Sequence, residues 1–304
     1  MTIVMPTYNG DAAYLGEAFE SAIRTGAPVL VVDDCSTKPA VRALLDAWEA
    51  RGATIVRRAR NLGLFGNLND GLARVTTSHA VILCGDDRLR EDALEIMERH
   101  IDAWPDVDLV VNEFVSIDPQ SRIVGRSHGA GLDAISTESR VLTHDEALRA
   151  VVQHGSFNGN ITGMLFRVAG FLRLPRFREG WRHAADWAYL VEVARHGKLA
   201  LGRAPIADVR WHDANLSGAN HRSGRSVEEV AAVIGELSRD PQLSDELRDA
   251  LYERATYVIR MSWARPPALL SALRTLRRER IGLVGSAKAV ARMIVRENRR
   301  RWLP

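Results

Sequence analysis

The sequence predicts an α/β fold with a mainly parallel sheet, flanking helices and a helical C-terminal extension. In residues 1–112, short apolar runs without polar alternation are separated by segments in which apolar residues have helical spacing. Strands of a parallel sheet are covered on both faces, so they read as unbroken apolar runs joined by helical crossovers. From residue 227 onward only helical patterns occur. A chain of 304 residues is long enough to bury a large core.

Five strands and four helices are expected in the first 112 residues. The strands are the apolar runs Thr2–Met5, Val29–Val32, Thr54–Val56, Ala80–Cys84 and Val107–Val111. The helices have apolar residues three and four positions apart and are Asp11–Arg24, Val41–Trp48, Phe65–Val75 and Glu91–Trp104. Strands that alternate with helices in this way predict successive parallel strand–helix–strand units.

The second half of the chain has a looser pattern. Ser116–Thr143 and Asp213–Ser226 are expected to be polar loops, and Leu199–Trp211 is expected to contain two short strands. Helices are expected at Asp145–Gln153, Ala184–Arg195, Val227–Leu237, Leu243–Met261, Ala268–Arg278 and Ile281–Arg300. We therefore expect a domain at 1–222, with halves 1–112 and 113–222, and a helical C-terminal region at 223–304.

The composition is that of an ordinary globular protein, with 46% hydrophobic and 26% charged residues. No apolar run reaches the ~18 residues of a membrane-spanning helix. The N-terminus has neither the basic region nor the cleavage site of a signal peptide. The only cysteines are Cys35 and Cys84, which excludes a disulfide framework and favours a cytoplasmic protein.

Charge is distributed unevenly along the chain. Residues 265–304 contain eleven of the 41 Lys and Arg but only two of the 38 Asp and Glu, a net charge of +9. The other residues carry a net charge of −6, which argues against a nucleic-acid-binding protein. Four basic residues in the segment 281–304 are spaced by four, on one side of the expected helix: Lys288, Arg292, Arg296 and Arg300. This pattern is typical either of a helix that contacts a membrane surface, here the inner membrane face, or of a packed helix with a solvated basic side.

Polar clusters follow three of the expected strands at their carboxyl ends. They are Pro6-Thr7-Tyr8-Asn9-Gly10, Asp33-Asp34-Cys35-Ser36-Thr37 and Gly85-Asp86-Asp87. Right-handed crossovers bring all three to the edge of the sheet where α/β proteins bind ligands. Two acidic pairs at that edge favour a divalent cation bound with phosphate, although one isolated pair is equally explained by a turn or a helix cap. The chain has no Gly-x-Gly-x-x-Gly motif after its first strand and no Gly-Lys-Ser/Thr, which disfavours dinucleotide-fold and P-loop chemistry.

These segments resemble successive motifs of the family 2 glycosyltransferases, which are inverting enzymes of the Rossmann-like GT-A fold. The resemblance covers about the first 220 residues and is carried by Ile3–Asn9, Val31–Thr37, Asn61–Gly63 and Ala80–Asp87. It implies a hexosyltransferase-type enzyme whose donor is a nucleotide-diphosphate sugar, with UDP- or dTDP-sugars favoured. Residues 1–112 would bind the nucleotide, and 113–222 would bind an acceptor hydroxyl on a small molecule, a glycan or a lipid-linked sugar.

The resemblance also implies roles for residues at the strand ends. Asp34 would accept a hydrogen bond from the base, Asp86 would approach the ribose or donor sugar, and Asp87 would ligate Mn²⁺ or Mg²⁺ at the diphosphate. The other residues of the donor nucleotide site would be Pro6, Thr7, Tyr8, Asn9, Asn61 and Gly63. Cys35 stands where the family often has glycine, which puts the turn geometry next to Asp34 in question.

An inverting transferase needs a base for the acceptor hydroxyl. Asp186 opens an apolar helical segment at the place where the family has an acidic motif, often Glu-Asp, but here Ala185 precedes it. We assign Asp186 as the general base. The alternative is a helix N-cap, and one carboxylate can fill both roles.

Further contacts are expected from the second half of the chain. His212 resembles a family histidine that completes the metal site, and imidazole suits Mn²⁺ better than Mg²⁺; a surface histidine is the alternative. The expected acceptor or donor-sugar residues are Asn158, Gly159, Trp181 and His183. Asn158 and Gly159 could instead form a tight connector, and for Trp187, which could also stack on a sugar, a core position is the better interpretation.

Two other functions share parts of this pattern. A nucleotidyltransferase of similar fold would need a basic, Gly-rich loop after the first strand, and Pro6–Gly10 contains no basic residue. A non-catalytic sugar-nucleotide or membrane adaptor would not need both Asp87 and Asp186. The sequence leaves open the sugar, the base, the acceptor and whether the chain forms a homo-oligomer.

Overall fold

The computed structural model describes residues 1–126, 130–157, 159–212, 225–241 and 243–262, and five positions between 270 and 278. Its centre is a ten-stranded sheet with the order β3-β2-β1-β4-β9-β6-β10-β5, to which β7 adds beside β6 and β8 beside β10. The strands are β1 (Thr2–Thr7), β2 (Val29–Asp33), β3 (Thr54–Arg57), β4 (His79–Ile82), β5 (Arg88–Leu89), β6 (Leu109–Ile117), β7 (Ile123–Arg126), β8 (Arg140–Val141), β9 (Met164–Arg167) and β10 (Leu199–Arg210).

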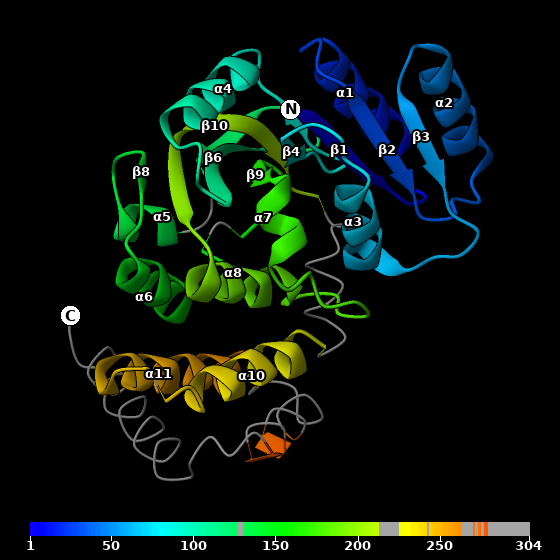
Figure 1. Ribbon diagram of the computed structural model, residues 1–304. Helices are drawn as coiled ribbons and strands as arrows, with labels where there is room; N and C mark the ends of the chain where they lie inside the picture. Colours follow the sequence, from blue (N-terminus) through cyan, green and yellow to red (C-terminus); the bar gives the residue numbers. More distant parts are fainter. Residues whose placement is uncertain are drawn as a thin grey trace, which may run out of the picture.

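The described helices are α1 (Ala12–Ile23), α2 (Pro39–Ala50), α3 (Gly63–Ala73), α4 (Ala93–Ala103), α5 (Ala130–Ile135), α6 (His144–His154), α7 (Val168–Arg173), α8 (Ala185–His196), α10 (Arg225–Ser238) and α11 (Asp245–Ser262). Helices α1–α8 surround the sheet, as Figure 1 shows. None of these helices, within the part of the chain that the structure describes, is long and apolar enough to span a membrane.

Most strands of the sheet share one direction. β3, β2, β1 and β4 are parallel to one another, and β6 is parallel to β10. β9 lies antiparallel between β4 and β6 and joins these two parallel parts. The α/β class expected from the unbroken apolar runs is therefore confirmed, and the first four expected strands form one continuous parallel block.

Each face of the sheet has its own core because successive side chains of a strand point to opposite faces. Ile3 and Met5 of β1 pack with the helices α1, α2 and α4 on one face. Val4 of the same strand belongs to the core on the other face, which includes residues of α3, α6, α7 and α8. That second core also includes Ile234 of α10 and Leu251 of α11.

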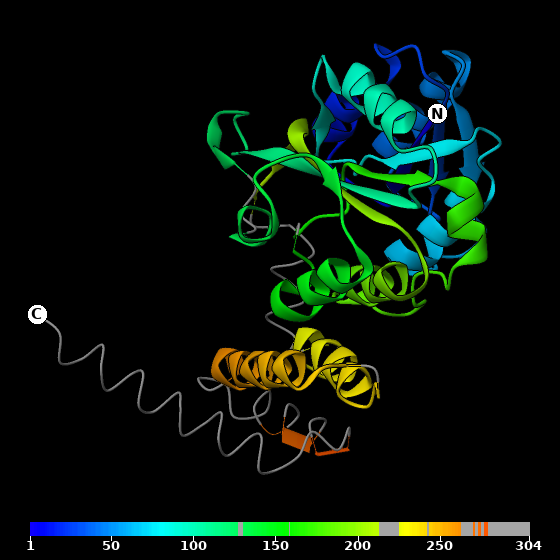
Figure 2. The same ribbon diagram turned by 60° about the vertical axis from the view of Figure 1, so that its left-hand side comes forward.

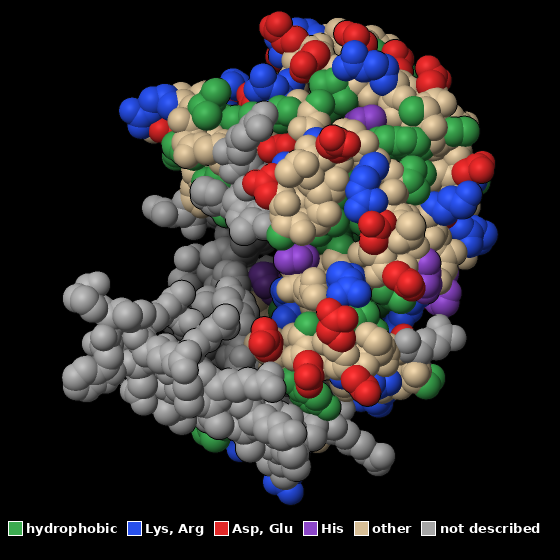
Figure 3. Space-filling view, turned by 90° about the vertical axis from the view of Figure 1, so that its left-hand side faces the viewer, with side chains coloured by type: hydrophobic (Ala, Val, Ile, Leu, Met, Phe, Trp, Pro, Cys, Tyr) green, Lys and Arg blue, Asp and Glu red, His purple; other side chains and the backbone are tan. Residues whose placement is uncertain are grey.

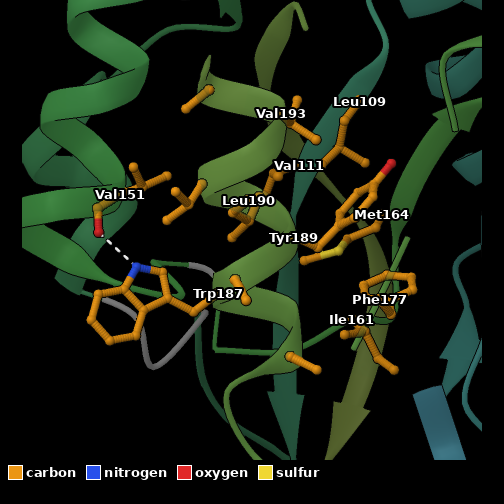
Figure 4. Close-up of a cluster of buried hydrophobic side chains, with 14 of the residues drawn as sticks. Leu109, Val111, Val151, Ile161, Met164, Phe177, Trp187, Tyr189, Leu190 and Val193 are labelled. Carbon is orange, nitrogen blue, oxygen red and sulfur yellow. Dashed lines mark hydrogen bonds between the residues drawn. The ribbon is translucent and has the colours of Figure 1, made fainter. Parts of the chain in front are cut away.

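Helices α10 and α11 form a further layer below α6 and α8, as both ribbon views show (Figures 1 and 2). Figure 4 shows how α8 presents two sides to its neighbours. Trp187 is buried, and its indole N–H donates a 2.8 Å hydrogen bond to the Val151 carbonyl of α6. Tyr189 faces the sheet side among Leu109 and Met164. The core interpretation of Trp187 is therefore confirmed.

Several details differ from the sequence prediction. Leu199–Trp211 was expected to hold two strands but forms the single strand β10, whose pairing with β6 is interrupted between Gly202 and Ala207. The polar segment Ser116–Thr143 contains β7, α5 and β8 in addition to turns. The sequence analysis also did not predict β9 and α7. The strand runs directly into the helix, and no turn residue separates the apolar residues of the two elements. The boundary at 222/223 and the segment 281–304 lie outside the described residues.

Candidate functional site

The carboxyl ends of β1, β2 and β4 meet at one edge of the sheet, because β1 lies between the other two and all three are parallel. Thr7 ends β1, Asp33 ends β2, and Asp86 and Asp87 follow β4. The amide of Asp34 donates a 2.8 Å hydrogen bond to the Thr7 carbonyl, which ties the first two strand ends together. The edge predicted from the polar clusters therefore exists.

Asp34 is buried, and its carboxylate holds the start of α3. Its two oxygens accept hydrogen bonds of 2.7 Å and 2.8 Å from the amides of Leu62 and Gly63. The Asn61 side chain donates to the Asp34 carbonyl, and the φ of +77° at Gly63 suits the turn into the helix. Burial raises the pKa of Asp34 and the two amides oppose that shift. Asn61, Gly63 and Asp34 thus form one interconnected loop beside Thr7.

Asn9 connects the β1 end to the turn after β2. Its side-chain oxygen accepts hydrogen bonds from the amides of Thr37 (2.8 Å) and Lys38 (2.9 Å), and its own amide donates to the Ser36 hydroxyl. Tyr8 beside it is 53% exposed, so its ring faces solvent at this edge. Pro6 lies within β1, paired with Val32.

Cys35 has a φ of +67°, in the left-handed region that favours glycine. Cys35 therefore adopts a glycine-like backbone conformation directly after Asp34, whose carboxylate is held by the Leu62 and Gly63 amides.

Asp87 is 3% exposed and held from three directions. Its Oδ1 accepts a 2.9 Å hydrogen bond from the Arg210 amide of β10, and its Oδ2 accepts one from the Thr162 hydroxyl. Asn160 approaches the same oxygen at 3.5 Å. Burial, together with the adjacent Asp86, raises the pKa of Asp87 to about 8. Burial leaves the ionised form of this carboxyl group poorly solvated, and a bound cation would favour that form.

Asp86 is the more accessible acid of the pair. Its side chain is 35% exposed, and its Oδ2 lies 3.3 Å from Nε2 of His212. Carboxylate and imidazole donors in this arrangement suit Mn²⁺. Among the described residues, no three His, Cys, Asp or Glu side chains gather as a complete metal site. The donor set therefore fits a cation that takes its remaining ligands from a diphosphate and water, as Mg²⁺ and Mn²⁺ commonly do.

Arg210 fixes the acidic turn from behind. It is 1% exposed, and its guanidinium donates to the Asp86 carbonyl (3.0 Å), to Glu17 of α1 (2.5 Å) and to the Ser121 hydroxyl (2.9 Å). It also lies over the ring of Tyr14, 4.4 Å from the centroid. One buried guanidinium thus joins β10, α1 and the β6–β7 turn to the strand end that carries Asp86 and Asp87.

Asp186 lies in the first turn of α8 and is 9% exposed. Its Oδ2 accepts a 2.5 Å hydrogen bond from the Ser156 hydroxyl, and its Oδ1 accepts the Trp187 amide at 2.8 Å. Burial raises the pKa of Asp186, and the hydrogen bond from Ser156 opposes that shift. The N-cap of α8 is Ala184, so the N-cap interpretation of Asp186 is wrong, although the carboxylate accepts one amide of the first turn.

A pocket of about 150 Å³ brings the two acidic centres together. It is lined by Leu64, Phe65, Cys84, Asp86, Asp87, Gly159, Asn160, Ile161, Arg182, His183, Asp186, Val209 and Trp211. Gly159 and His183 are thus part of the pocket, whereas Trp181 is not; its ring packs against the core and under Arg178. Asn158 lies outside the described residues. Figure 3 shows charges of both signs interspersed over one outer face, in contrast to the acidic concentration in the pocket.

Several residues of the site were missed by the sequence analysis. Thr162 and Asn160 lie next to Asn158 and Gly159, in the segment predicted to be a donor-sugar or acceptor contact or a tight connector, and Arg210 is the last residue of β10. Ser156 is thirty positions from Asp186. Cys84 also lines the pocket, and burial raises the pKa of its thiol well above the usual value. No local pattern signals these contacts, because each joins segments that meet only in the fold.

Comparisons with known proteins agree with this geometry. Residues 2–166 match the family described as glycosyl transferase family 2. A curated relative, the uncharacterized protein y4gI of Sinorhizobium fredii, is 30% identical over 119 residues, which are 37% of this chain and 13% of that protein. The chain therefore spans a small part of that relative's length.

Solved structures share the fold at low identity. S. aureus TarS 1-349 in complex with UDP-GlcNAc has a TM-score of 0.67 and 16% identity, over 91% of this chain and 80% of that one. The mannosyltransferase PcManGT from Pyrobaculum calidifontis, in complex with GDP-Man and Mn²⁺, has a TM-score of 0.53 and 18% identity, over 97% and 79%. The family match covers more than half of the chain and agrees with the strand-end motifs. The chain belongs to glycosyl transferase family 2 and has the GT-A type of fold.

Proposed function

We propose that this glycosyltransferase moves a sugar from a nucleotide-diphosphate sugar to an acceptor hydroxyl with inversion at the anomeric carbon. The observation that carries the proposal is that Asp186 and the pair Asp86–Asp87, from opposite halves of the fold, line one pocket. An in-line displacement needs a base on one side of the anomeric carbon and charge stabilisation on the other. The nucleotide sugars bound by the TarS and PcManGT structures support this class of donor.

The nucleotide is proposed to lie along the ends of β1 and β2, with a UDP- or dTDP-sugar favoured. The Thr7 hydroxyl is buried there without a hydrogen-bond partner among the described residues. An unpaired buried hydroxyl is costly, so a ligand at this edge would satisfy it. Asp34 is proposed to contact the base while it holds the loop of Asn61 and Gly63 in place.

A divalent cation is proposed to be held at the mouth of the pocket. Asp87 and His212 are proposed as its ligands, and Asp86, 3.3 Å from His212, offers a further accessible carboxylate. When bound, the cation would neutralise charge on the departing diphosphate. Thr162 and the Arg210 amide orient Asp87, and Arg210 fixes the turn that presents Asp86.

Asp186 is proposed to remove the proton of the acceptor hydroxyl. Ser156 and the Trp187 amide fix the two carboxylate oxygens, so the carboxylate is oriented before the acceptor arrives. Its raised pKa makes the Asp186 carboxylate a stronger base, which favours general base catalysis. Gly159 and His183 are proposed to contact the sugar or the acceptor from the same pocket.

The proposal is tested by incubating the chain with UDP-, dTDP- and GDP-sugars and with Mn²⁺, Mg²⁺ or EDTA. We expect release of a nucleoside diphosphate that depends on the cation and is lost in Asp186→Asn, while donor binding by that variant remains. Pyrophosphate release would indicate a nucleotidyltransferase. Donor binding without any turnover would indicate an adaptor, and full activity of Asp186→Asn would contradict the assignment of the base.

The proposed membrane contact of 281–304 and a cytoplasmic, inner-face location remain predictions, since that segment lies outside the described residues. Flotation of the full chain with anionic vesicles, compared with a chain that lacks 281–304, tests the contact. Equal flotation of both chains would contradict it.

A further inference from the structure

The segment that leads into the helix of Asp186 is held by a residue from the C-terminal helical layer. Glu229 of α10 accepts hydrogen bonds from the amides of Arg182 (2.8 Å), His183 (2.7 Å) and Ala184 (2.9 Å), all directly before α8. Both carboxylate oxygens take part. A residue more than forty positions downstream thus fixes the backbone that enters the helix.

This contact fixes the chain that enters α8, a helix without a side-chain cap at its own N-cap residue. The first amides of a helix have no partner within it, and a side chain at the N-cap normally satisfies one of them. Ala184 stands at that position and makes no side-chain cap. Asp186 accepts the Trp187 amide, and its other oxygen is bonded to Ser156. The amides before Ala185 therefore depend on Glu229.

A second contact from the same layer reaches the other segment that holds Asp186. Arg254 of α11 donates a 2.6 Å hydrogen bond to the Gln153 carbonyl and lies 5.1 Å from the centre of the Trp187 ring. Gln153 lies in the last turn of α6, three residues before Ser156, which bonds Asp186. Helices α10 and α11 therefore hold the backbone that leads to Asp186 and the end of the helix that precedes its hydrogen-bond donor.

We propose that Glu229 is a positioning residue for Asp186, so that α10 completes the active site although it contributes no side chain to the pocket. The inference rests on the proposed function, in which Asp186 is the base. Glu229 acts through the three amides that it holds: without them the first turn of α8 is free to shift, and small displacements of a catalytic group reduce turnover strongly.

The charge of Glu229 gives the proposal a second readout. The charged and titratable groups around Asp186 are Asp86, Asp87, Arg182, His183, Glu229 and Arg254. A negative charge near the N-terminus of α8 disfavours ionisation of Asp186 and offsets the helix amides, which favour it. Removal of that charge therefore lowers the pKa of Asp186 and moves the acidic limb of the rate profile to lower pH.

The chain supplies a matched control at the opposite end of the same helix. Asp240, just beyond α10, pairs with Arg195 in the last turn of α8 at 2.6 Å. Asp240→Asn removes a carboxylate that docks the same two elements but leaves the entry of α8 intact. A purely structural role of the C-terminal layer predicts similar losses from Glu229→Gln and Asp240→Asn.

The experiment measures nucleoside diphosphate release, with Mn²⁺ and the most active nucleotide sugar of the UDP, dTDP and GDP panel. For Glu229→Gln we expect kcat to fall about ten- to a hundredfold, with donor KM changed by less than about threefold. The acidic limb should move to lower pH, and Asp240→Asn should keep the wild-type kcat and profile. Glu229→Asp, which keeps the charge on a shorter side chain, should lose kcat without moving the limb.

Hydrogen exchange of the full chain tests the contact without activity. Peptides that contain residues 182–184 should exchange faster in Glu229→Gln than in the wild type and in Asp240→Asn. Unchanged exchange, unchanged kcat in Glu229→Gln, or equal losses in the two variants would overturn the inference. An inactive Asp186→Asn beside a fully active Glu229→Gln refutes only this inference, whereas an active Asp186→Asn refutes the proposed base.

Discussion

The hydroxyl of Thr162, in the segment before β9, donates a 2.5 Å hydrogen bond to Oδ2 of Asp87 at the end of β4. The same hydroxyl accepts the amide of Cys84 at 3.0 Å. Thr162 is fully buried, so water does not compete for either hydrogen bond. One side chain therefore supports both the backbone and the carboxylate of the acidic turn.

Thr162→Val is expected to weaken cation binding and stability together. The loss of the donor raises the pKa of Asp87 and leaves the Cys84 amide unsatisfied, at a cost of about 1–3 kcal/mol in the free energy of unfolding. Calorimetric titration of Mn²⁺ in the presence of UDP should show an affinity lower by about tenfold or more. Thr162→Ser keeps the hydroxyl and should bind Mn²⁺ as the wild type does. Equal affinities for the valine and serine variants would contradict this role.

Ser156→Ala is expected to move the acidic limb of kcat/KM to higher pH. The Ser156 hydroxyl favours the ionised form of Asp186, so its removal raises the pKa of the carboxyl group further. The base is active only when ionised. As the pH is lowered, the variant therefore loses activity earlier, at a higher pH than the wild type. The measurement is a pH–rate profile of nucleoside diphosphate release. A limb that stays in place or moves to lower pH would show that the bond does not act on the base.

Asp186→Asn is expected to be more stable than the wild type at neutral pH. Because the folded-state pKa of Asp186 lies above its unfolded value of 3.8, ionisation destabilises the folded state as pH rises through and beyond that range. The stability advantage of the variant should therefore be present at neutral pH and disappear near pH 4. Urea unfolding at several pH values measures it, and a difference that grows toward acid pH would contradict the sign.

Cys35→Gly is expected to stabilise the fold. A cysteine at a φ of +67° carries left-handed strain of about 1–2 kcal/mol, and the extra entropy of glycine in the unfolded chain offsets about 0.4–1 kcal/mol of the gain. The net increase in the free energy of unfolding should be about 0.5–1 kcal/mol. Cys35→Ala keeps the strain and serves as the control; an alanine variant as stable as the glycine variant would rule out relief of strain.

The parallel part of the fold could be predicted because its signals are local. Unbroken apolar runs, helical spacing and polar residues at strand ends placed Thr7, Asp34 and Asp87 at one edge. The same reasoning failed for β9, since an antiparallel strand between β4 and β6 depends on pairing with strands far away in the sequence. The long strand β10 was divided in two because the interruption after Gly202 breaks its apolar pattern.

The support of the site could not be predicted for a related reason. Arg210 reads as an ordinary basic residue at a strand end, yet it is buried across three elements. Glu229 reads as one acidic residue on an amphipathic helix, and nothing in its neighbours indicates that it binds the amides before α8. Reactive carboxylates follow recognisable motifs, whereas the residues that orient them are scattered along the chain.

The core that α10 and α11 share with α6 and α8 limits how chimeric enzymes of this family can be built. Ile234, Leu237 and Leu251 interdigitate with that core, so the C-terminal layer cannot be exchanged as an independent module. A graft from another member would have to bring matching surfaces of both underlying helices, together with a substitute for the carboxylate of Glu229.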